Sequence, residues 1–324
     1  MPGDKKTHKS EMDYLKELIL RSGFPLEIEI TSFLTEKCKL IDYKYMGIET
    51  DILTCAYYLD KDEGKGRELD IKARVPISTE IKKSPMIYLN LLIQCKNIPG
   101  NAWVFFKSPH RIKPHSAEYC CGVTSVLNVL KWLPRLDFEF KFLLDKRFEG
   151  LPTTTVFDEY ILDKNTSNNQ KDNLFDAVIS LAKATSYEVE LANRSYKKDI
   201  EKLCVEETDA EDLALLLGYA EIFYPIVIFS GKMYVAEDVA KGKRMKLTPV
   251  DHVGLFFNYV SGSYDIDLAL DIMTKDAFGS FFKNISRDTK VLRNALNGDI
   301  GKSFDRELVK ALKFYSSSRG SRQE

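Results

Sequence analysis

The chain has 324 residues, of which 44% are hydrophobic and 29% are charged. These proportions are those of an ordinary globular protein that buries a sizeable core. The formal net charge is -1 at pH 7, so the chain lacks the large positive excess of a domain that coats nucleic acid. Any contact with DNA must therefore come from local basic patches.

Six cysteines and four histidines are scattered along the chain without a CxxC pair. This spacing argues against a structural zinc site and against a disulfide framework. The N-terminal segment is polar and lacks the apolar centre of a secretory signal. The most apolar stretch, residues 213–229, is too short and too interrupted to span a bilayer. We therefore expect reduced thiols, a cytoplasmic location and no transmembrane segment.

Two helices are predicted at the start of the chain. Ser10 is placed to cap a helix over residues 11–22, whose apolar residues recur at helical spacing. Pro25 suits the first turn of a second helix over residues 26–38, because the donor that proline lacks would have been unpaired there anyway. Glu27 then lies in the first turn of this second helix.

Strands are predicted next. Residues 52–59 and 67–77 are rich in β-branched and aromatic types and flank a polar, glycine-containing turn, which is typical of a hairpin. Residues 85–96 form a nearly continuous apolar run, which predicts a third strand that is buried on both faces. A short fourth run, residues 102–106, follows directly.

The rest of the chain is predicted to alternate between helices and strands. We interpret residues 109–170 as an insertion with one helix, and residues 172–185 as an amphipathic helix. Further strands are expected in the segments EIFYPIVIF, KMYVAEDV, HVGLFFNYV and YDIDLALDIM, before closing helices. The predicted parts are the first part of the core (1–108), the insertion (109–170), the second part of the core (171–275) and a helical C-terminal extension (276–324).

Polar residues stand out in the third predicted strand. Side chains alternate along a strand, so Gln94 and Lys96 share one face while Cys95 points to the other. An ammonium group in this apolar strand needs an acidic partner, and the neighbouring strand offers Glu68 and Asp70 on one face. Paired strands bring such groups within about 5 to 8 Å. A carboxylate, an amide oxygen and an ammonium at this range suit a divalent cation with an adjacent water.

This pattern resembles the PD-(D/E)XK nuclease superfamily, at REL-Asp70 followed by LLI-Gln94-Cys95-Lys96. The glutamine is similar to the QxK form of the Mrr group of restriction enzymes and of some resolvase-like nucleases. The resemblance covers about residues 10–106 and continues loosely through the helix near 173–187 and the strands after it. It implies an α/β fold with a restriction-endonuclease-like mixed sheet flanked by helices, with a helical insertion and a helical C-terminal extension.

The resemblance also implies roles for individual residues. Asp70 would bind Mg²⁺ or Mn²⁺, Gln94 and the Cys95 carbonyl would complete the protein ligands, and Lys96 would serve the attacking water. Glu27 matches the glutamate that often joins such sites from the preceding helix, and it would be a further ligand of the metal. The implied reaction is hydrolysis of phosphodiester bonds in DNA, in defence against foreign DNA or in DNA repair. Because a duplex has two strands to cut, a homodimer is the assembly that the resemblance suggests.

Other interpretations remain open. Asp70 and Lys96 would form a structural ion pair in a non-catalytic module that binds nucleic acid or protein. Glu27 would be a first-turn carboxylate stabilised by the helix dipole. A third hypothesis is a cysteine peptidase, in which Cys121 precedes a predicted helix that lowers the pKa of its thiol and His252 follows far along the chain.

Basic residues are clustered at several places in the sequence. The segment KSPHRIKPH, just beyond the predicted third and fourth strands, is the favoured site for contact with DNA phosphates. Its candidate residues are Lys107, Arg111 and Lys113.

Overall fold

The structure is a computed structural model that describes residues 10–41, 50–77, 87–98, 100–107, 122–124, 151–162, 173–205, 220–237, 245–297 and 310. It combines four helices with two β-sheets, so the predicted α/β class is confirmed. Within the described ranges, no helix combines the length and the apolar character that crossing a bilayer requires.

The helices and strands largely follow the predicted order. The helices are α1 (Glu11–Arg21), α2 (Phe24–Ile41), α3 (Asn173–Val205) and α5 (Lys275–Asn297). The strands are β1 (Asp51–Asp60), β2 (Lys65–Ile77), β3 (Ile87–Lys96), β4 (Asn101–Phe106), β5 (Gly122–Thr124), β6 (Thr153–Thr154), β7 (Val156–Ile161), β8 (Ala220–Phe229), β9 (Lys232–Glu237), β10 (Lys246–Val250), β11 (His252–Val260) and β12 (Asp265–Thr274).

The larger sheet has the strand order β1-β2-β3-β8-β12-β11-β6, and β5 pairs with β8 beside this path. β1, β2 and β3 form an antiparallel meander, as their consecutive apolar runs predict. β8 then runs parallel to β3, and β12 runs parallel to β8. All residues of β3 up to Cys95 are buried, which confirms that this strand is covered on both faces.

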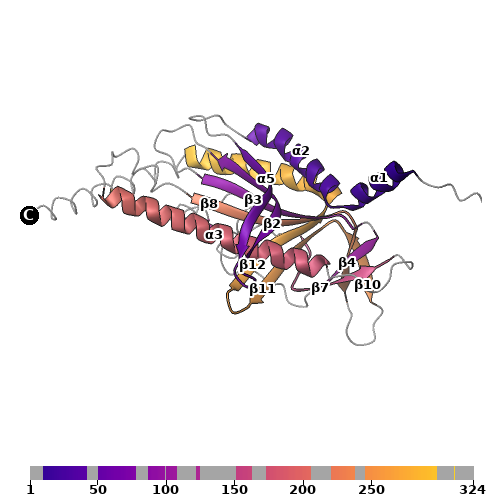
Figure 1. The fold of residues 1–324 in the computed structure, drawn as a ribbon. Helices are drawn as coiled ribbons and strands as arrows, with labels where there is room; N and C mark the ends of the chain where they lie inside the picture. The colour runs from indigo at the N-terminus through magenta and orange to yellow at the C-terminus, as the bar shows by residue number, and fades with distance from the viewer. Residues whose placement is uncertain are drawn as a thin grey trace, which may run out of the picture.

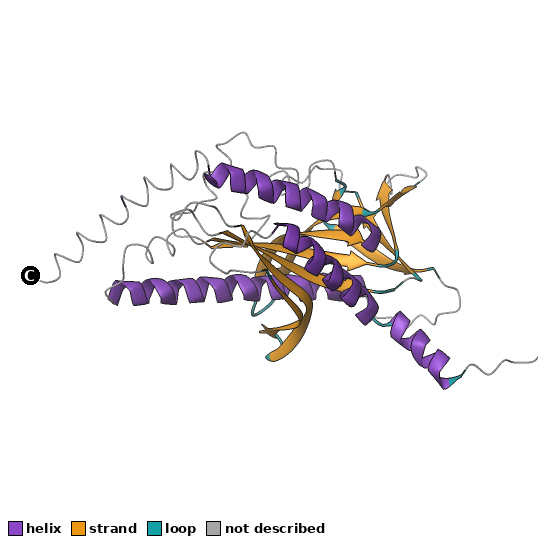
Figure 2. Cartoon of the chain, turned by 90° about the horizontal axis from the view of Figure 1, so that it is seen from above, coloured by secondary structure: helices purple, strands orange, loops and turns teal. Residues whose placement is uncertain are grey.

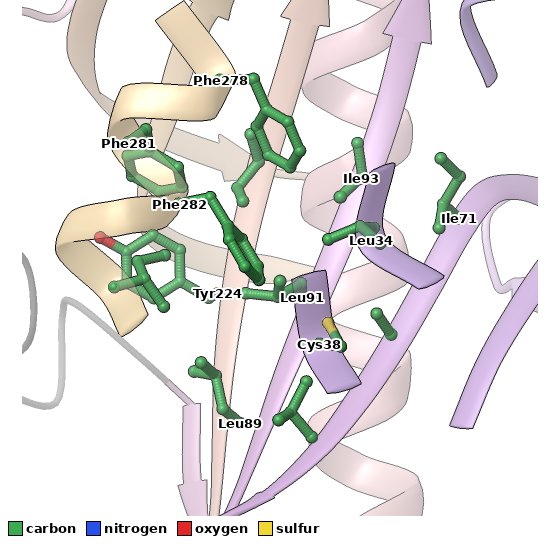
Figure 3. Close-up of a cluster of buried hydrophobic side chains, with 14 of the residues drawn as sticks. Leu34, Cys38, Ile71, Leu89, Leu91, Ile93, Tyr224, Phe278, Phe281 and Phe282 are labelled. Atoms are coloured by element: carbon green, nitrogen blue, oxygen red, sulfur yellow. The ribbon is translucent and has the colours of Figure 1, made fainter. Parts of the chain in front are cut away.

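Helices α2 and α5 cover one face of this sheet, and α3 lies across the other (Figure 1). Between β2, β3, α2 and α5, side chains such as Ile71, Leu91 and Leu34 interlock with Phe278 and Phe282 (Figure 3). This packing stabilises α2 against the meander, because each large side chain buried there contributes about 1.5–3 kcal/mol. The N-terminal turn of α2 is thereby held beside the end of β3.

The smaller sheet, with the order β10-β9-β4-β7, packs into the second apolar cluster, on the α3 side of the large sheet. Trp103 on β4 stacks on Phe229 at the end of β8, with ring centroids 3.7 Å apart. The predicted fourth strand therefore exists, but it belongs to this second sheet.

Two parts of the predicted organisation can be compared with the structure only over their described residues. The described residues of the 109–170 insertion form the strands β5, β6 and β7, and the rest of that segment lies outside the described residues. The helix α5 is not an extension, because Phe278, Phe281, Phe282 and Ile285 belong to the main core. Its apolar stripe at helical spacing covers the sheet beside α2. The remainder of the predicted extension, apart from residue 310, lies outside the described residues.

A buried ionic network fastens the β1–β2 turn to α3. The Lys183 ammonium lies 3.0 Å from Asp60 Oδ2 and 2.9 Å from Asp62 Oδ2. The same ammonium lies 5.3 Å from the centre of the Tyr264 ring, a cation–π distance. Because Lys183 and Asp60 are both almost completely buried, each depends on the other for its charge to be tolerated.

Helix α1 projects away from the body of the protein (Figures 1 and 2). None of its residues belongs to the two apolar clusters of the described chain. Its large apolar side chains are exposed, namely Met12, Tyr14, Leu15, Leu18, Ile19 and Leu20.

Candidate functional site

The predicted site residues meet where β2 separates from β3. The ladder between these strands starts at Ile77 opposite Ile87 and ends at Ile71 opposite Ile93. One residue beyond this end, Asp70 Oδ2 accepts the Cys95 backbone N–H at 2.6 Å. The carboxylate thus satisfies a main-chain donor of β3 at the point where pairing with β2 stops.

Asp70 is buried and is held in one orientation by two donors. Besides the Cys95 N–H, the Gln94 side-chain amide donates from Nε2 to Asp70 Oδ2 at 2.7 Å. Burial nevertheless raises the pKa of Asp70, although both hydrogen bonds and the charge of Lys96 act in the opposite direction. The surroundings of Asp70 therefore disfavour the ionised form of its carboxyl group.

Gln94 carries an unused acceptor. Its Oε1 is buried and has no hydrogen-bond partner in the described structure. A buried oxygen without a partner loses free energy relative to water, about 1–3 kcal/mol, so such atoms are rare in folded proteins. An amide oxygen placed next to a buried carboxylate is a ligand position for a hard cation.

Glu27 lies in the first turn of α2, as predicted. Its pKa is raised to about 7, chiefly by burial and also by the charges of Asp70 and Glu68, while Lys96 acts in the opposite direction. The ionisation of Glu27 on α2 is therefore coupled to that of Asp70 and Glu68 on β2. The alternative role, a carboxylate stabilised only by its helix dipole, does not account for this upward shift, because a dipole of that sign lowers a carboxyl pKa.

Two neighbours hold Glu27 in this position. Asn97, just after β3, donates from Nδ2 to the carbonyl oxygens of Leu20 at 2.8 Å and Ser22 at 2.7 Å. These hydrogen bonds fasten the junction of α1 and α2 to the end of β3. Gly23 leaves room for the carboxyl group, because a Cβ at this position would lie 2.9 Å from Glu27 Oε1.

Cys55 and Glu68 complete the surroundings of the site. Cys55 on β1 has a φ of 53°, which few residues other than glycine adopt. A hydrogen bond to Glu68 raises the pKa of the Cys55 thiol to about 11, so the thiol stays protonated at neutral pH. The strand pattern predicts Glu68 on the same face as Asp70. It contains no signal for Cys55, because alternation assumes regular strand geometry.

Lys96 lies at the partly exposed end of β3. Its positive charge lowers the pKa of both Asp70 and Glu27, against the upward effect of burial. No ion pair joins Lys96 to Asp70 among the interactions of the described residues. The interpretation of these two residues as a structural cross-strand ion pair is therefore not supported.

The fit of a metal ion depends on more than acidic side chains. Among the described residues, no three His, Cys, Asp or Glu side chains are arranged to hold a metal ion. The ligand set implied by the resemblance also uses amide and main-chain oxygens, and it consists of Asp70, Glu27, the amide oxygen of Gln94 and the Cys95 carbonyl. Mg²⁺ keeps several waters when only one or two carboxylates bind it. Gln94 turns its Nε2 toward Asp70 and leaves Oε1 buried without a partner, so the amide group would have to turn over for Oε1 and Asp70 to bind one cation together.

The predicted phosphate contacts are only partly described. Lys107 forms an exposed ion pair with Glu237, with 2.7 Å between Nζ and Oε1. Arg111 and Lys113 lie outside the described residues.

The residues of the peptidase hypothesis do not form a described site. Cys121 lies outside the described residues, and the three residues after it form β5 rather than the start of a helix. His252 Nε2 lies 2.6 Å from Asp271 Oδ1, and the two residues are buried beside the Phe281 ring. The rest of the segment in which that helix is predicted lies outside the described residues.

No protein-family model, curated protein or solved structure matches this chain. Function is therefore inferred from the chemistry of the residues that the fold brings together.

Proposed function

We propose that the protein is a metal-dependent nuclease that hydrolyses phosphodiester bonds in DNA. The observation that carries the proposal is the buried contact between Asp70 and Gln94, with the unused Gln94 Oε1 beside it. Glu27 and Lys96 act electrostatically on the same place. A purely structural role for this group gives no reason to leave a buried acceptor unpaired.

The order of the elements supports the same proposal. Helix α2, the meander β1–β2–β3, helix α3 and the strand β8 follow one another in the order helix, three strands, helix, strand, with β4 to β7 inserted. In the sheet, β8 lies next to β3 and parallel to it. This is the arrangement expected from the resemblance to the PD-(D/E)XK superfamily. The β3 strand of the proposed site thus lies inside the sheet, where neighbours on both sides hold it rigid.

Each residue of the site would have its own role in the reaction. Asp70, Gln94 and the Cys95 carbonyl would hold Mg²⁺ or Mn²⁺, while the Cys95 N–H keeps the Asp70 carboxylate oriented. When bound, the metal stabilises charge on the phosphate and lowers the pKa of a water. Lys96 would orient the attacking water beside the phosphate. Glu27 has a pKa of about 7 without metal, and with the cation bound it would be ionised and able to accept a proton at neutral pH.

Electrostatics favour a cation at this site. Asp70 and Glu68 raise the pKa of Glu27, which means that the carboxylates repel one another. A divalent cation would relieve this repulsion and lower the pKa of Glu27. Binding of the metal would thus release protons near neutral pH.

Nicking of supercoiled plasmid DNA in the presence of Mg²⁺ or Mn²⁺ tests the proposal. The wild-type chain is expected to nick the plasmid, and Asp70→Asn and Lys96→Ala are expected to lose activity on the order of 100-fold or more. Lys65→Ala is the matched control, because Lys65 is an exposed lysine of β2 that pairs with Glu63. Equal loss in Lys65→Ala, or metal-independent nicking that survives in Asp70→Asn, would contradict the proposal.

A further inference from the structure

The outer face of helix α5 carries a row of polar and basic side chains. The inner face of this helix packs on the large sheet beside α2 (Figure 1). Its most exposed positions recur every three or four residues, which places them on one side of the helix. In chain order they are Asp276, Ser280, Lys283, Arg287, Lys290 and Asn294.

The last five of these residues form a surface without a carboxylate, which we call the basic face of α5. Asp276 lies before it, in the first turn, where a carboxylate interacts favourably with the helix dipole. The other acidic residue of α5, Asp288, is completely buried, so its side chain is not part of this surface. Lysine, arginine, serine and asparagine are residue types that contact phosphate groups in protein–DNA complexes.

The two lysines of the basic face are available to an external anion. Neither Lys283 nor Lys290 takes part in an ion pair among the described residues. Exposed lysines elsewhere do form such pairs, since Lys65 and Lys107 each lie 2.7 Å from a glutamate oxygen. Arg287 lies between the two lysines on the same side of the helix and adds a third positive charge. A chain with a net charge of -1 thus gathers positive charge on one surface.

The spacing of these charges suits the backbone of a nucleic acid. Seven residues of helix separate Lys283 from Lys290, so their Cα atoms lie about 10 Å apart. One strand of B-DNA carries a phosphate about every 3.4 Å along its axis, so the two long side chains can reach different phosphates. A lipid surface is a poorer partner, because helices that bind membranes insert large apolar side chains, and the described part of α5 exposes none.

The basic face continues from the end of the sheet that carries Glu27. At the start of α5, Lys275 Nζ lies 2.8 Å from Glu29 Oε2 of α2, two residues beyond Glu27. Lys283 follows eight residues later, about 12 Å along the helix. A DNA strand that lies along α5 therefore runs toward the candidate nuclease site.

We propose that the basic face of α5 binds the phosphate backbone of duplex DNA. Lys283 and Lys290 contact phosphates directly, and Ser280 and Asn294 extend the contact along the helix. Because phosphates carry no sequence information, this surface positions the duplex without selecting its sequence. The inference rests on the proposed nuclease function for the choice of DNA as the anion, but binding is measured without metal and so apart from cleavage.

Fluorescence anisotropy of a labelled 20-base-pair duplex in EDTA, at several NaCl concentrations from about 50 to 200 mM, tests the proposal. The wild type is expected to bind. Replacing both Lys283→Ala and Lys290→Ala is expected to weaken binding about tenfold or more at the lowest salt concentration. Because each lost phosphate contact removes about 0.9 from the slope of log K against log salt, that slope should fall by about 2.

Two further variants separate this role from a general effect of charge. Lys283→Arg with Lys290→Arg keeps both charges and should bind like the wild type. Lys16→Ala with Lys65→Ala is the matched control, because it removes two exposed lysines from other surfaces and should leave the salt slope unchanged.

Several outcomes would overturn the proposal. They are a wild type that binds phosphatidylserine vesicles but not the duplex, a Lys283→Ala and Lys290→Ala variant with the wild-type salt slope, and an equal loss in the control. Metal-dependent nicking by a protein whose DNA binding is unchanged in that variant would refute this surface alone. Binding through this surface without nicking in Mg²⁺ or Mn²⁺ would support it and refute the nuclease.

Discussion

Replacing Asp70 by asparagine is predicted to stabilise the metal-free protein. Burial raises the pKa of Asp70, so the ionised carboxylate present at neutral pH lowers the stability of the fold. Asparagine has nearly the same shape, and its amide oxygen can still accept both the Cys95 N–H and the Gln94 Nε2, because both donate to the same oxygen of Asp70. The loss of charge-assisted hydrogen bonds offsets part of the gain. We expect a net gain in the free energy of unfolding, because the cost of burying the charge is removed.

Asp60→Asn is the matched comparison, because Asp60 is also a buried aspartate of the β1–β2 hairpin. Asp60 accepts from the buried Lys183 ammonium at 3.1 and 3.0 Å through its two oxygens. Its neutralisation leaves that ammonium with Asp62 as its remaining anionic partner. Breaking a buried pair in this way typically lowers stability by about 3–5 kcal/mol, and Asp62 should limit the loss to the lower end. The two substitutions are thus expected to change stability in opposite directions.

Urea unfolding in EDTA at neutral pH measures both effects, and thermal unfolding should show a rise of about 2–4 °C for Asp70→Asn. Addition of Mn²⁺ is expected to stabilise the wild type and to leave Asp70→Asn unchanged. If Asp70→Asn instead destabilises the metal-free protein as strongly as Asp60→Asn does, Asp70 is a structural residue and the reasoning is wrong.

Three further predictions concern α2, the second sheet and α1. The pKa of Glu27 rises from 4.5 to about 7 in the fold, so its contribution to stability is fully present below about pH 4.5 and is lost as the pH rises through 7. Glu27→Gln should flatten this decline in stability, as measured by urea unfolding between about pH 5 and pH 8. A decline that is unchanged in Glu27→Gln would contradict the prediction. Gly231→Ala should lower the free energy of unfolding by about 1–3 kcal/mol in the same assay. The new Cβ would lie 2.1 Å from Phe229 Cζ, and that ring is stacked on Trp103. An unchanged free energy of unfolding would refute this packing. Removal of residues 1–18 should lower the unfolding free energy by less than about 1 kcal/mol, since α1 adds nothing to the described core, and a larger loss would show that α1 is docked.

Local patterns predict the meander and its buried strand. The apolar runs of β1, β2 and β3 are consecutive and separated by polar turns, and neighbouring strands of that kind usually pair. The position of α5 is different, because its helical stripe shows which side is apolar but not which sheet face it covers. That choice depends on the surface that α2 leaves open, which only the folded chain defines.

The contact between Asp70 and Gln94 could be predicted from the sequence, but the detailed geometry of the candidate site could not. Pairing of β2 with β3 places Asp70 near Gln94, and this contact is present at 2.7 Å. The bond from Cys95 N–H to the Asp70 carboxylate arises where the ladder ends, and no residue pattern marks that end. The positive φ of Cys55 and the raised pKa of Glu27 likewise depend on tertiary contacts.

Anomalous scattering from crystals soaked in Mn²⁺ tests the central claim most directly. We expect one Mn²⁺ bound by Asp70 and Gln94 Oε1 near the Cys95 carbonyl in the wild type, and none at that position in Asp70→Asn. Wild-type crystals that bind Mn²⁺ only elsewhere, or that leave Gln94 Oε1 without a ligand at saturating Mn²⁺, would contradict the account.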